Sequence, residues 1–128
     1  MRNTSSRRAG ATYLDRDERI RRLREAALRG SARVPSIKRV ILFGSLVEGI
    51  PTPRSDADLM IEVRSSLHAE PRDRIPEMLR ALSPLPCPID LFVYTSGELD
   101  RGAKEGSPLL REIFAHGIDL LDDSAHSP

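Results

Sequence analysis

The sequence predicts a mixed α/β fold in which helices pack on a small mixed β-sheet, and three short apolar segments carry this prediction. Residues 40–43, 58–63 and 89–94 are rich in β-branched, aliphatic and aromatic side chains, which is typical of buried strands. Helical segments separate them, and strands that alternate with helices commonly form one sheet covered by helices. A chain of 128 residues is expected to form one domain.

The first helix is predicted from a repeat of apolar residues that follows Asp15, which we expect to cap it. Gly30 is interpreted as the end of this helix. Residues 1–13 are polar and basic without periodicity, so they are predicted to be a flexible basic tail before a domain over residues 14–121. The repeating apolar residues are Ile20, Leu23 and Ala27.

The middle of the chain is expected to contain a turn, a loop and a second helix. Residues 46–49 are predicted to make one short helical turn, and residues 50–55, with two prolines, to form a loop. Pro71 suits the first turn of a helix, because its missing N–H would be unpaired there anyway. The buried face of this helix is predicted to comprise Ile75, Met78, Leu79 and Leu82.

The last part of the chain is predicted to hold two more helices and an edge strand. A helix is expected within residues 95–105, and Ser107 is expected to cap a final helix that ends at Gly117. Residues 118–121 are predicted to form the edge strand, and residues 122–128 a flexible tail. The apolar face of the final helix is predicted to comprise Leu109, Leu110, Ile113 and Phe114.

Composition excludes several classes of protein. No apolar run approaches the ~18 residues of a membrane span, and the first residues lack the apolar stretch of a secretory signal. We therefore expect a cytoplasmic protein without a membrane partner. Cys87 is the only cysteine, so no disulfide forms within the chain, and we do not expect it to be catalytic. The histidines lack metal-ligand spacing and are expected at the surface or in the tail: His68, His116 and His126.

The formal net charge of +1 conceals an asymmetry along the chain. Residues 1–40 carry 12 basic and 4 acidic residues, whereas residues 41–128 carry 8 and 15. A basic arm attracts nucleic acid, nucleotides or acidic partners. Aromatic side chains are not interleaved with these arginines as they are on single-strand-binding surfaces, so direct nucleic-acid binding is not expected and a solvated helix face is favoured.

The most informative residues are Asp56 and Asp58, which stand two apart at the start of the second predicted strand. Residues two apart in a strand point to the same side. Two carboxylates that face each other repel unless a cation lies between them. Magnesium prefers oxygen ligands and is usually held by one or two carboxylates together with substrate phosphates. This pair therefore predicts Mg²⁺ and a phosphate-bearing substrate.

Asp90 is the second unusual carboxylate, because it lies inside the apolar third strand. A buried charge is costly unless it is paired, bound to metal or placed at an open strand end. If the third strand lies beside the second, Asp90 completes a cluster of three aspartates. Such a cluster is suited to hold two metal ions about 4 Å apart for an in-line displacement at phosphorus.

Gly44 and Ser45 end the first strand and supply the complementary half of the predicted site. A glycine at a strand end lets the backbone approach a ligand closely. Backbone N–H groups of the following turn can then point at phosphate oxygens, aided by a helix N-terminus. An anion cradle beside a carboxylate cluster is what phosphoryl chemistry requires.

Gly44-Ser45, ten residues, Asp56-Ala57-Asp58 and the later Asp90 together resemble the DNA polymerase β-like nucleotidyltransferase superfamily. Within it, the short chain resembles the minimal nucleotidyltransferases, which are antitoxin partners of HEPN-domain ribonuclease toxins. The resemblance spans about residues 38–121.

The resemblance implies a role for each residue. Gly44 and Ser45 would hold the β- and γ-phosphates of ATP, and Asp56 and Asp58 would bind the metals. Asp90 would share a metal and help to deprotonate the acceptor hydroxyl. The implied reaction transfers AMP from ATP to a hydroxyl and releases pyrophosphate. In the antitoxin branch the acceptor is typically a tyrosine of the HEPN-type toxin, which is silenced.

The sequence also departs from the family pattern. Members often carry basic residues after the Gly-Ser pair, whereas residues 46–49 are Leu-Val-Glu-Gly, and only Arg54 in the next loop offers compensation.

Simpler interpretations remain for each site residue. Asp56 and Asp58 could be turn residues, Asp90 a strand-end partner of an arginine, and Ser45 a helix cap. Glu62 faces the same side as Asp58 but is expected to lie too far along to join the metals.

Three functions follow from these observations. The first is a minimal nucleotidyltransferase that adenylylates a partner toxin. The second is a catalytically weak module with the same fold that neutralises a toxin by binding. The third is a nucleotidyltransferase for a small molecule such as an aminoglycoside, a class that usually needs a second domain or a dimer.

Overall fold

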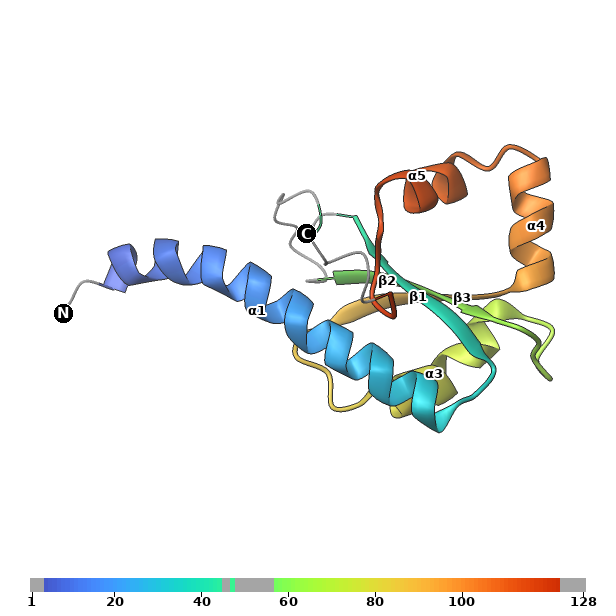
Figure 1. The fold of residues 1–128 in the computed structure, drawn as a ribbon, viewed down its shortest axis with the longest axis horizontal. Coiled ribbons are helices and arrows are strands. Elements are labelled where there is room, and N and C mark those ends of the chain that lie inside the picture. The colour runs from blue at the N-terminus through green and yellow to red at the C-terminus, as the bar shows by residue number, and fades with distance from the viewer. Residues whose placement is uncertain (1–3, 45–46, 48–56, 123–128) are drawn as a thin grey trace.

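The computed structural model describes residues 4–44, 47 and 57–122, with side chains from residue 16 onward. It is the mixed α/β fold that the sequence predicts: a four-stranded sheet with helices on both faces (Figure 1). Among the described residues, no helix combines the length and the apolarity needed to cross a membrane. Ser45 and Asp56, and the turn and loop predicted after Gly44 apart from Val47, lie outside the described residues.

The sheet has the strand order β3-β2-β1-β4. Its strands are β1 (Ile37–Phe43), β2 (Ala57–Val63), β3 (Ile89–Thr95) and β4 (Ile118–Asp119). The strand β1 is antiparallel to β2 and to β4, whereas β2 and β3 are parallel. The carboxyl end of β1 therefore meets the amino ends of β2 and β3 at one end of the sheet.

Helices cover the two faces unequally. The long helix α1 (Thr4–Arg33) and α3 (Ile75–Leu82), which follows the 3-10 turn η1 (Pro71–Arg74), lie on one face. On the other face lie α4 (Ser96–Lys104) and α5 (Pro108–His116). Alternate residues of each strand therefore enter two apolar clusters, a larger one under α1 and α3 and a smaller one under α4 and α5.

Local sequence signals explain most helix ends. Thr95 and Glu98 form the capping box that begins α4. As predicted, Ser107 caps α5: its hydroxyl accepts a hydrogen bond from the N–H of Leu110. The buried face predicted for α3 is confirmed, because Met78 and Leu82 are buried and its other two members pack against the core.

The first helix differs from the prediction at both ends. It begins at Thr4, so residues 4–13 of the predicted flexible tail are helical in their backbone, and residues 1–3 lie outside the described residues. Arginine and alanine are good helix formers, and extending a helix is easier than nucleating one. Gly30 does not end the helix, because it lies where α1 packs against α3: a Cβ there would meet Leu82 Cδ2 at 2.8 Å. The helix instead ends at Arg33.

Two arginines of α1 hold the end of α3. Arg29 donates to the carbonyls of residues 82–84, and Arg33 donates to those of residues 80, 81 and 83. The last carbonyls of a helix have no intrahelical partner, so these contacts satisfy them.

Only two of the four residues predicted to form the buried face of α5 are buried. Leu110 and Ile113 are buried, but Leu109 and Phe114 are each 43% exposed. The helix is short and lies at the margin of the smaller cluster, so only one narrow stripe meets the sheet. Phe114 instead lies under the guanidinium of Arg39, 5.3 Å from its ring centre.

Candidate active site

Asp58 and Asp90 are brought together by the sheet. They are direct neighbours in the register of the parallel strands β2 and β3, each the second residue of its strand. Neighbouring strands lie about 4.8 Å apart, and paired residues point to the same face. Both carboxylates therefore lie on the α4–α5 face at the amino ends of their strands, so the condition for Asp90 to join Asp58 is met, while Asp56 lies outside the described residues.

Gly44 completes this end of the sheet. Phe43, the last residue of β1, pairs with Asp58, and Gly44 follows with a φ of 82°. A Cβ on Gly44 would collide with Asp58 Oδ2, so the carboxylate occupies the space that any other side chain would need. The positive φ and this close approach both require glycine at this position.

The electrostatics of the pair favour a cation. Partial burial raises the pKa of Asp58 above its ordinary value, and the nearby charge of Asp90 raises it further. A divalent cation between the carboxylates would stabilise their charged forms and so oppose both effects. The donors are carboxylate oxygens, the ligands that magnesium prefers, so Asp58 and Asp90 fit such an ion. Among the described residues no group of three or more potential metal ligands is present; the predicted third ligand, Asp56, lies outside them.

Arg16 of α1 contacts Val47, the next described residue after Gly44. Its Nη2 donates a 2.7 Å hydrogen bond to the carbonyl oxygen of Val47, three residues beyond Gly44. Val47 is half-buried, and its side chain packs against the larger cluster. No motif marks Arg16 among the many arginines of the arm, so sequence reasoning missed this contact.

Glu62 faces the same side as Asp58, but its carboxylate binds Lys38, Arg39 and Ser96. It is 3% exposed, and its Oε1 lies 3.0 Å from Arg39 Nε and its Oε2 3.7 Å from Lys38 Nζ. The hydroxyl of Ser96 donates to Oε2 at 2.6 Å. These contacts tie β2 to β1 and to the start of α4, so Glu62 is a structural residue, as its position along the strand predicts.

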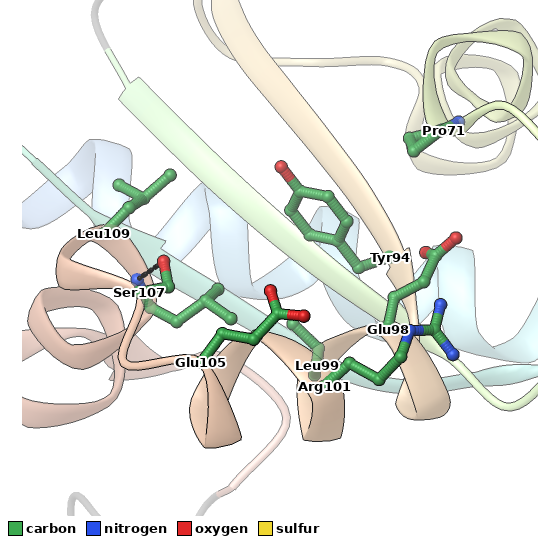
Figure 2. Close-up of a pocket in the computed structure, with 10 residues that line it drawn as sticks. Pro71, Tyr94, Glu98, Leu99, Arg101, Glu105, Ser107 and Leu109 are labelled. Carbon is green, nitrogen blue, oxygen red and sulfur yellow. Dashed lines mark hydrogen bonds between the residues drawn. The ribbon is translucent and has the colours of Figure 1, made fainter.

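A cavity of about 400 Å³ opens on the same face, farther along β3 (Figure 2). Tyr94 of β3 and Glu105 at the end of α4 border it, and Leu109 at the start of α5 lies at one side. Asp90 and Tyr94 are four residues apart, which corresponds to about 13 Å along a strand. The volume suits a side chain or a small organic group.

The wall of this cavity is fixed by a buried ion pair. Arg74 of η1 donates to Glu98 of α4 through two parallel hydrogen bonds of 2.7 and 3.0 Å, and also to the carbonyl of Val93. These bonds lower the pKa of Glu98 and raise that of Arg74. Sequence analysis missed both the capping motif Thr95–Glu98, which its Thr-x-x-Glu spacing could have revealed, and the arginine partner, which no local signal marks.

Comparison with known proteins shows to which family this chain belongs. The family described as the nucleotidyltransferase domain matches residues 20–121, which include Gly44, Asp58 and Asp90. The chain belongs to the nucleotidyltransferase domain family. This membership supports nucleotidyl transfer as the general activity, and it makes the chain a transferase.

A solved structure is similar in fold to this nucleotidyltransferase domain. It is a crystal structure from Sulfolobus solfataricus, provisionally described as a nucleotidyltransferase, and its sequence is 21% identical. The match covers 70% of this chain and 78% of that one, with a TM-score of 0.56. At this identity the similarity confirms the fold alone. A search of curated proteins finds no match.

Proposed function

We propose that this nucleotidyltransferase domain transfers AMP from ATP to a hydroxyl of a partner protein, with magnesium as cofactor. The observation that carries the proposal is the pairing of Asp58 with Asp90 directly beside Gly44. Bound magnesium would supply positive charge that neutralises the phosphate oxygens. Asp58 and Asp90 would hold it, with Asp56 as the further ligand that the family resemblance implies.

The order of the strands supports a direction for the reaction. Gly44 follows β1, Asp58 lies on β2 and Asp90 lies on β3, so Asp58 stands between the other two. With the β- and γ-phosphates at Gly44 and Ser45, the α-phosphorus lies near Asp58. Attacking and leaving oxygens are roughly in line in phosphoryl transfer. The acceptor hydroxyl therefore approaches from the β3 side.

The proposed transfer forms one bond to the α-phosphorus, breaks another and moves one proton. The acceptor oxygen forms a bond to the α-phosphorus while the bond from that phosphorus to the oxygen bridging to the β-phosphate breaks. Pyrophosphate leaves on the side of Gly44. Asp90 accepts the proton of the acceptor hydroxyl.

We further propose that the acceptor is a tyrosine of a HEPN-type toxin and that the transfer silences it. The cavity lined by Tyr94 and Leu109, on the same face of the sheet as Asp90, supports a macromolecular acceptor, because it would receive a second side chain of the partner, apart from the one that carries the reacting hydroxyl. The exposed apolar residues Leu109 and Phe114 of α5 lie on the same face of the sheet and support contact with a protein.

The test is transfer from ATP labelled at the α-phosphate to a co-expressed HEPN-domain protein, compared with ATP labelled at the γ-phosphate. We expect the α-label alone to appear on the partner, on tyrosine by mass spectrometry, and to be absent with Asp58→Asn. Label on a small hydroxyl compound but not on protein would contradict the proposed acceptor. Neutralisation of the toxin that survives Asp58→Asn with Asp90→Asn would instead favour a module that acts by binding, which the exposed side chains of α5 would also serve.

A further inference from the structure

The strand β3 is the outer strand on the proposed acceptor side, so one of its edges has no neighbouring strand among the described residues. In a strand, the backbone N–H and C=O groups of alternate residues turn to the same side. At the carboxyl half of this edge, the ion pair of Arg74 with Glu98 binds the backbone groups that a neighbouring strand would bind. Its arginine donates to the carbonyl of Val93, and its glutamate accepts from the N–H of Thr95 at 2.9 Å.

The amino half of the same edge is open. Ile89 and Leu91 stand four and two residues before Val93, so their backbone N–H and C=O groups also turn outward. Among the described residues, neither a turn nor a side chain bonds to these groups. Unpaired backbone groups on a sheet edge are a template for pairing with another chain. The open stretch is short, and Asp90 stands at its centre.

An antiparallel segment added to this stretch would place one of its side chains beside Asp90. Ile89 and Leu91 would each exchange two hydrogen bonds with the residue opposite, which leaves Asp90 in a pair without hydrogen bonds. The Cα atoms of such a pair lie about 4.5 Å apart, and their side chains are closer than in a hydrogen-bonded pair. Both side chains point to the same face, so the opposite residue would stand next to the carboxylate that is proposed to accept the proton.

The charge of Asp90 indicates which kind of chain can occupy this edge. If two copies of β3 paired through Ile89 and Leu91, Asp90 of one copy would lie directly opposite Asp90 of the other. Like charges directly opposite each other destabilise a sheet, and a charge on an edge strand discourages such self-pairing. The segment that fits therefore comes from another protein and carries an uncharged residue opposite Asp90.

We infer that the acceptor binds as an extended segment that adds an antiparallel strand to β3 along residues 89–91, with the acceptor residue opposite Asp90. This inference rests on the proposed function, because it takes the acceptor to be a protein hydroxyl whose proton passes to Asp90. It adds the structural form of the acceptor. Main-chain hydrogen bonds hold the segment, and the position opposite Asp90 selects the hydroxyl residue.

The first test is AMP transfer to a co-expressed HEPN-domain protein by the wild type, Ile89→Pro and Ile89→Val. Proline removes the outward N–H and is tolerated at the first residue of a strand, whereas valine keeps the N–H and only shortens the side chain. We expect Ile89→Pro to raise the KM for the protein acceptor about tenfold, because a hydrogen bond is lost and the ring obstructs the added strand. Its affinity for Mg-ATP should change less than about twofold, and Ile89→Val should resemble the wild type in both.

The outcomes of this test separate the inference from the proposed function. An unchanged KM for Ile89→Pro would overturn the inference while transfer to the partner still stands. A wild type that labels no protein would contradict the proposed function itself.

The second test examines the same pairing with the unaltered chain. The probes are short peptides centred on the partner residue that takes the label, each with one methylated backbone nitrogen. Methylation of the residue before or after the acceptor removes an N–H that faces β3, whereas methylation of the acceptor's own nitrogen removes one that faces away. We expect labelling to fall about tenfold for the first two peptides and less than about twofold for the third. Equal labelling of all three, or no labelling of the unmethylated peptide when the folded partner is labelled, would overturn the inference.

Discussion

Asp58 and Asp90 occupy the same register position on two parallel strands, so the charge of Asp90 adds to the cost of charging Asp58. This relationship is unfavourable in the protein without metal and useful only when a cation is bound. Removing a charge from this pair should therefore stabilise the folded protein without metal but lower its activity.

The first prediction concerns Asp58→Asn. Because burial and Asp90 disfavour the charged form of Asp58, removing the charge should raise the melting temperature in the presence of a chelator at about pH 7. The same change should lower AMP transfer more than about 100-fold, since a metal ligand is lost. Thermal unfolding and the α-label assay measure the two effects. The control Asp100→Asn, at an exposed position of α4, should change neither. A lower melting temperature for Asp58→Asn would show that the charge is already compensated.

The second prediction concerns Gly44→Ala. The added methyl would collide with Asp58 Oδ2, and the φ of 82° would be strained by about 1–2 kcal/mol. Asp58 must move, so we expect transfer to be lost while the free energy of unfolding falls only by that amount. Gly97→Ala is the matched control, because the nearest atom to a methyl group there would be Arg101 Nη1, at 3.9 Å. Full activity of Gly44→Ala would mean that transfer does not require the close approach of Gly44 to Asp58.

The third prediction is a pH dependence of stability from Glu98. Its pKa is lowered from 4.5 in the folded protein, chiefly by the hydrogen bonds from Arg74. The unfolded state therefore binds the proton first as pH falls, and the stabilisation is complete above the unfolded pKa and lost as pH drops through the lower folded pKa. Glu98→Gln should cost about 2 kcal/mol at neutral pH, the value of a charged hydrogen bond.

Denaturant titrations at several pH values measure this effect. The difference in unfolding free energy between wild type and Glu98→Gln should shrink below about pH 4.5. A difference that stays constant down to about pH 3 would show that packing, and not the charge of Glu98, is responsible.

The fourth prediction concerns the proposed acceptor side. Leu109→Glu places a charge at the edge of the cavity beside Tyr94, at a position that is 43% exposed and so tolerates the change. We expect labelling of the protein acceptor to fall about tenfold through a higher KM, because a charge must be desolvated at the contact. Affinity for Mg-ATP should not change. The control Leu67→Glu, at a fully exposed position in the loop before η1, should label the acceptor normally.

The sequence was sufficient to predict the three longer strands and to single out Asp58 and Asp90, which lie side by side on two of them. The apolar runs give the strands, and the one charged residue in the run of β3, Asp90, is the residue that the register places beside Asp58. Alternation along a strand and a costly buried charge are local signals, so they can be read without the structure.

Contacts between distant elements could not be read in this way. Gly30 looks like a helix end but serves close packing against Leu82, and nothing local distinguishes the two roles. Arg16 donates to the carbonyl of Val47, 31 positions away, and Arg74 binds Glu98, 24 positions away. Many arginines of the chain have a similar local sequence, so the sequence does not show which of them make such contacts. The exposure of Leu109 and Phe114 likewise depends on how much of α5 the sheet can cover.

The bond from Arg24 Nη1 to the carbonyl of Leu120 joins the first helix to the residue after the last strand, across 96 positions. During synthesis the helix emerges long before this carbonyl. The contact, and the pairing of β4 with β1, must therefore wait until residues 118–120 have left the ribosome. A stalled or truncated product would carry Gly44, Asp58 and Asp90 yet leave the sheet open along β1, exposed to pairing with other chains.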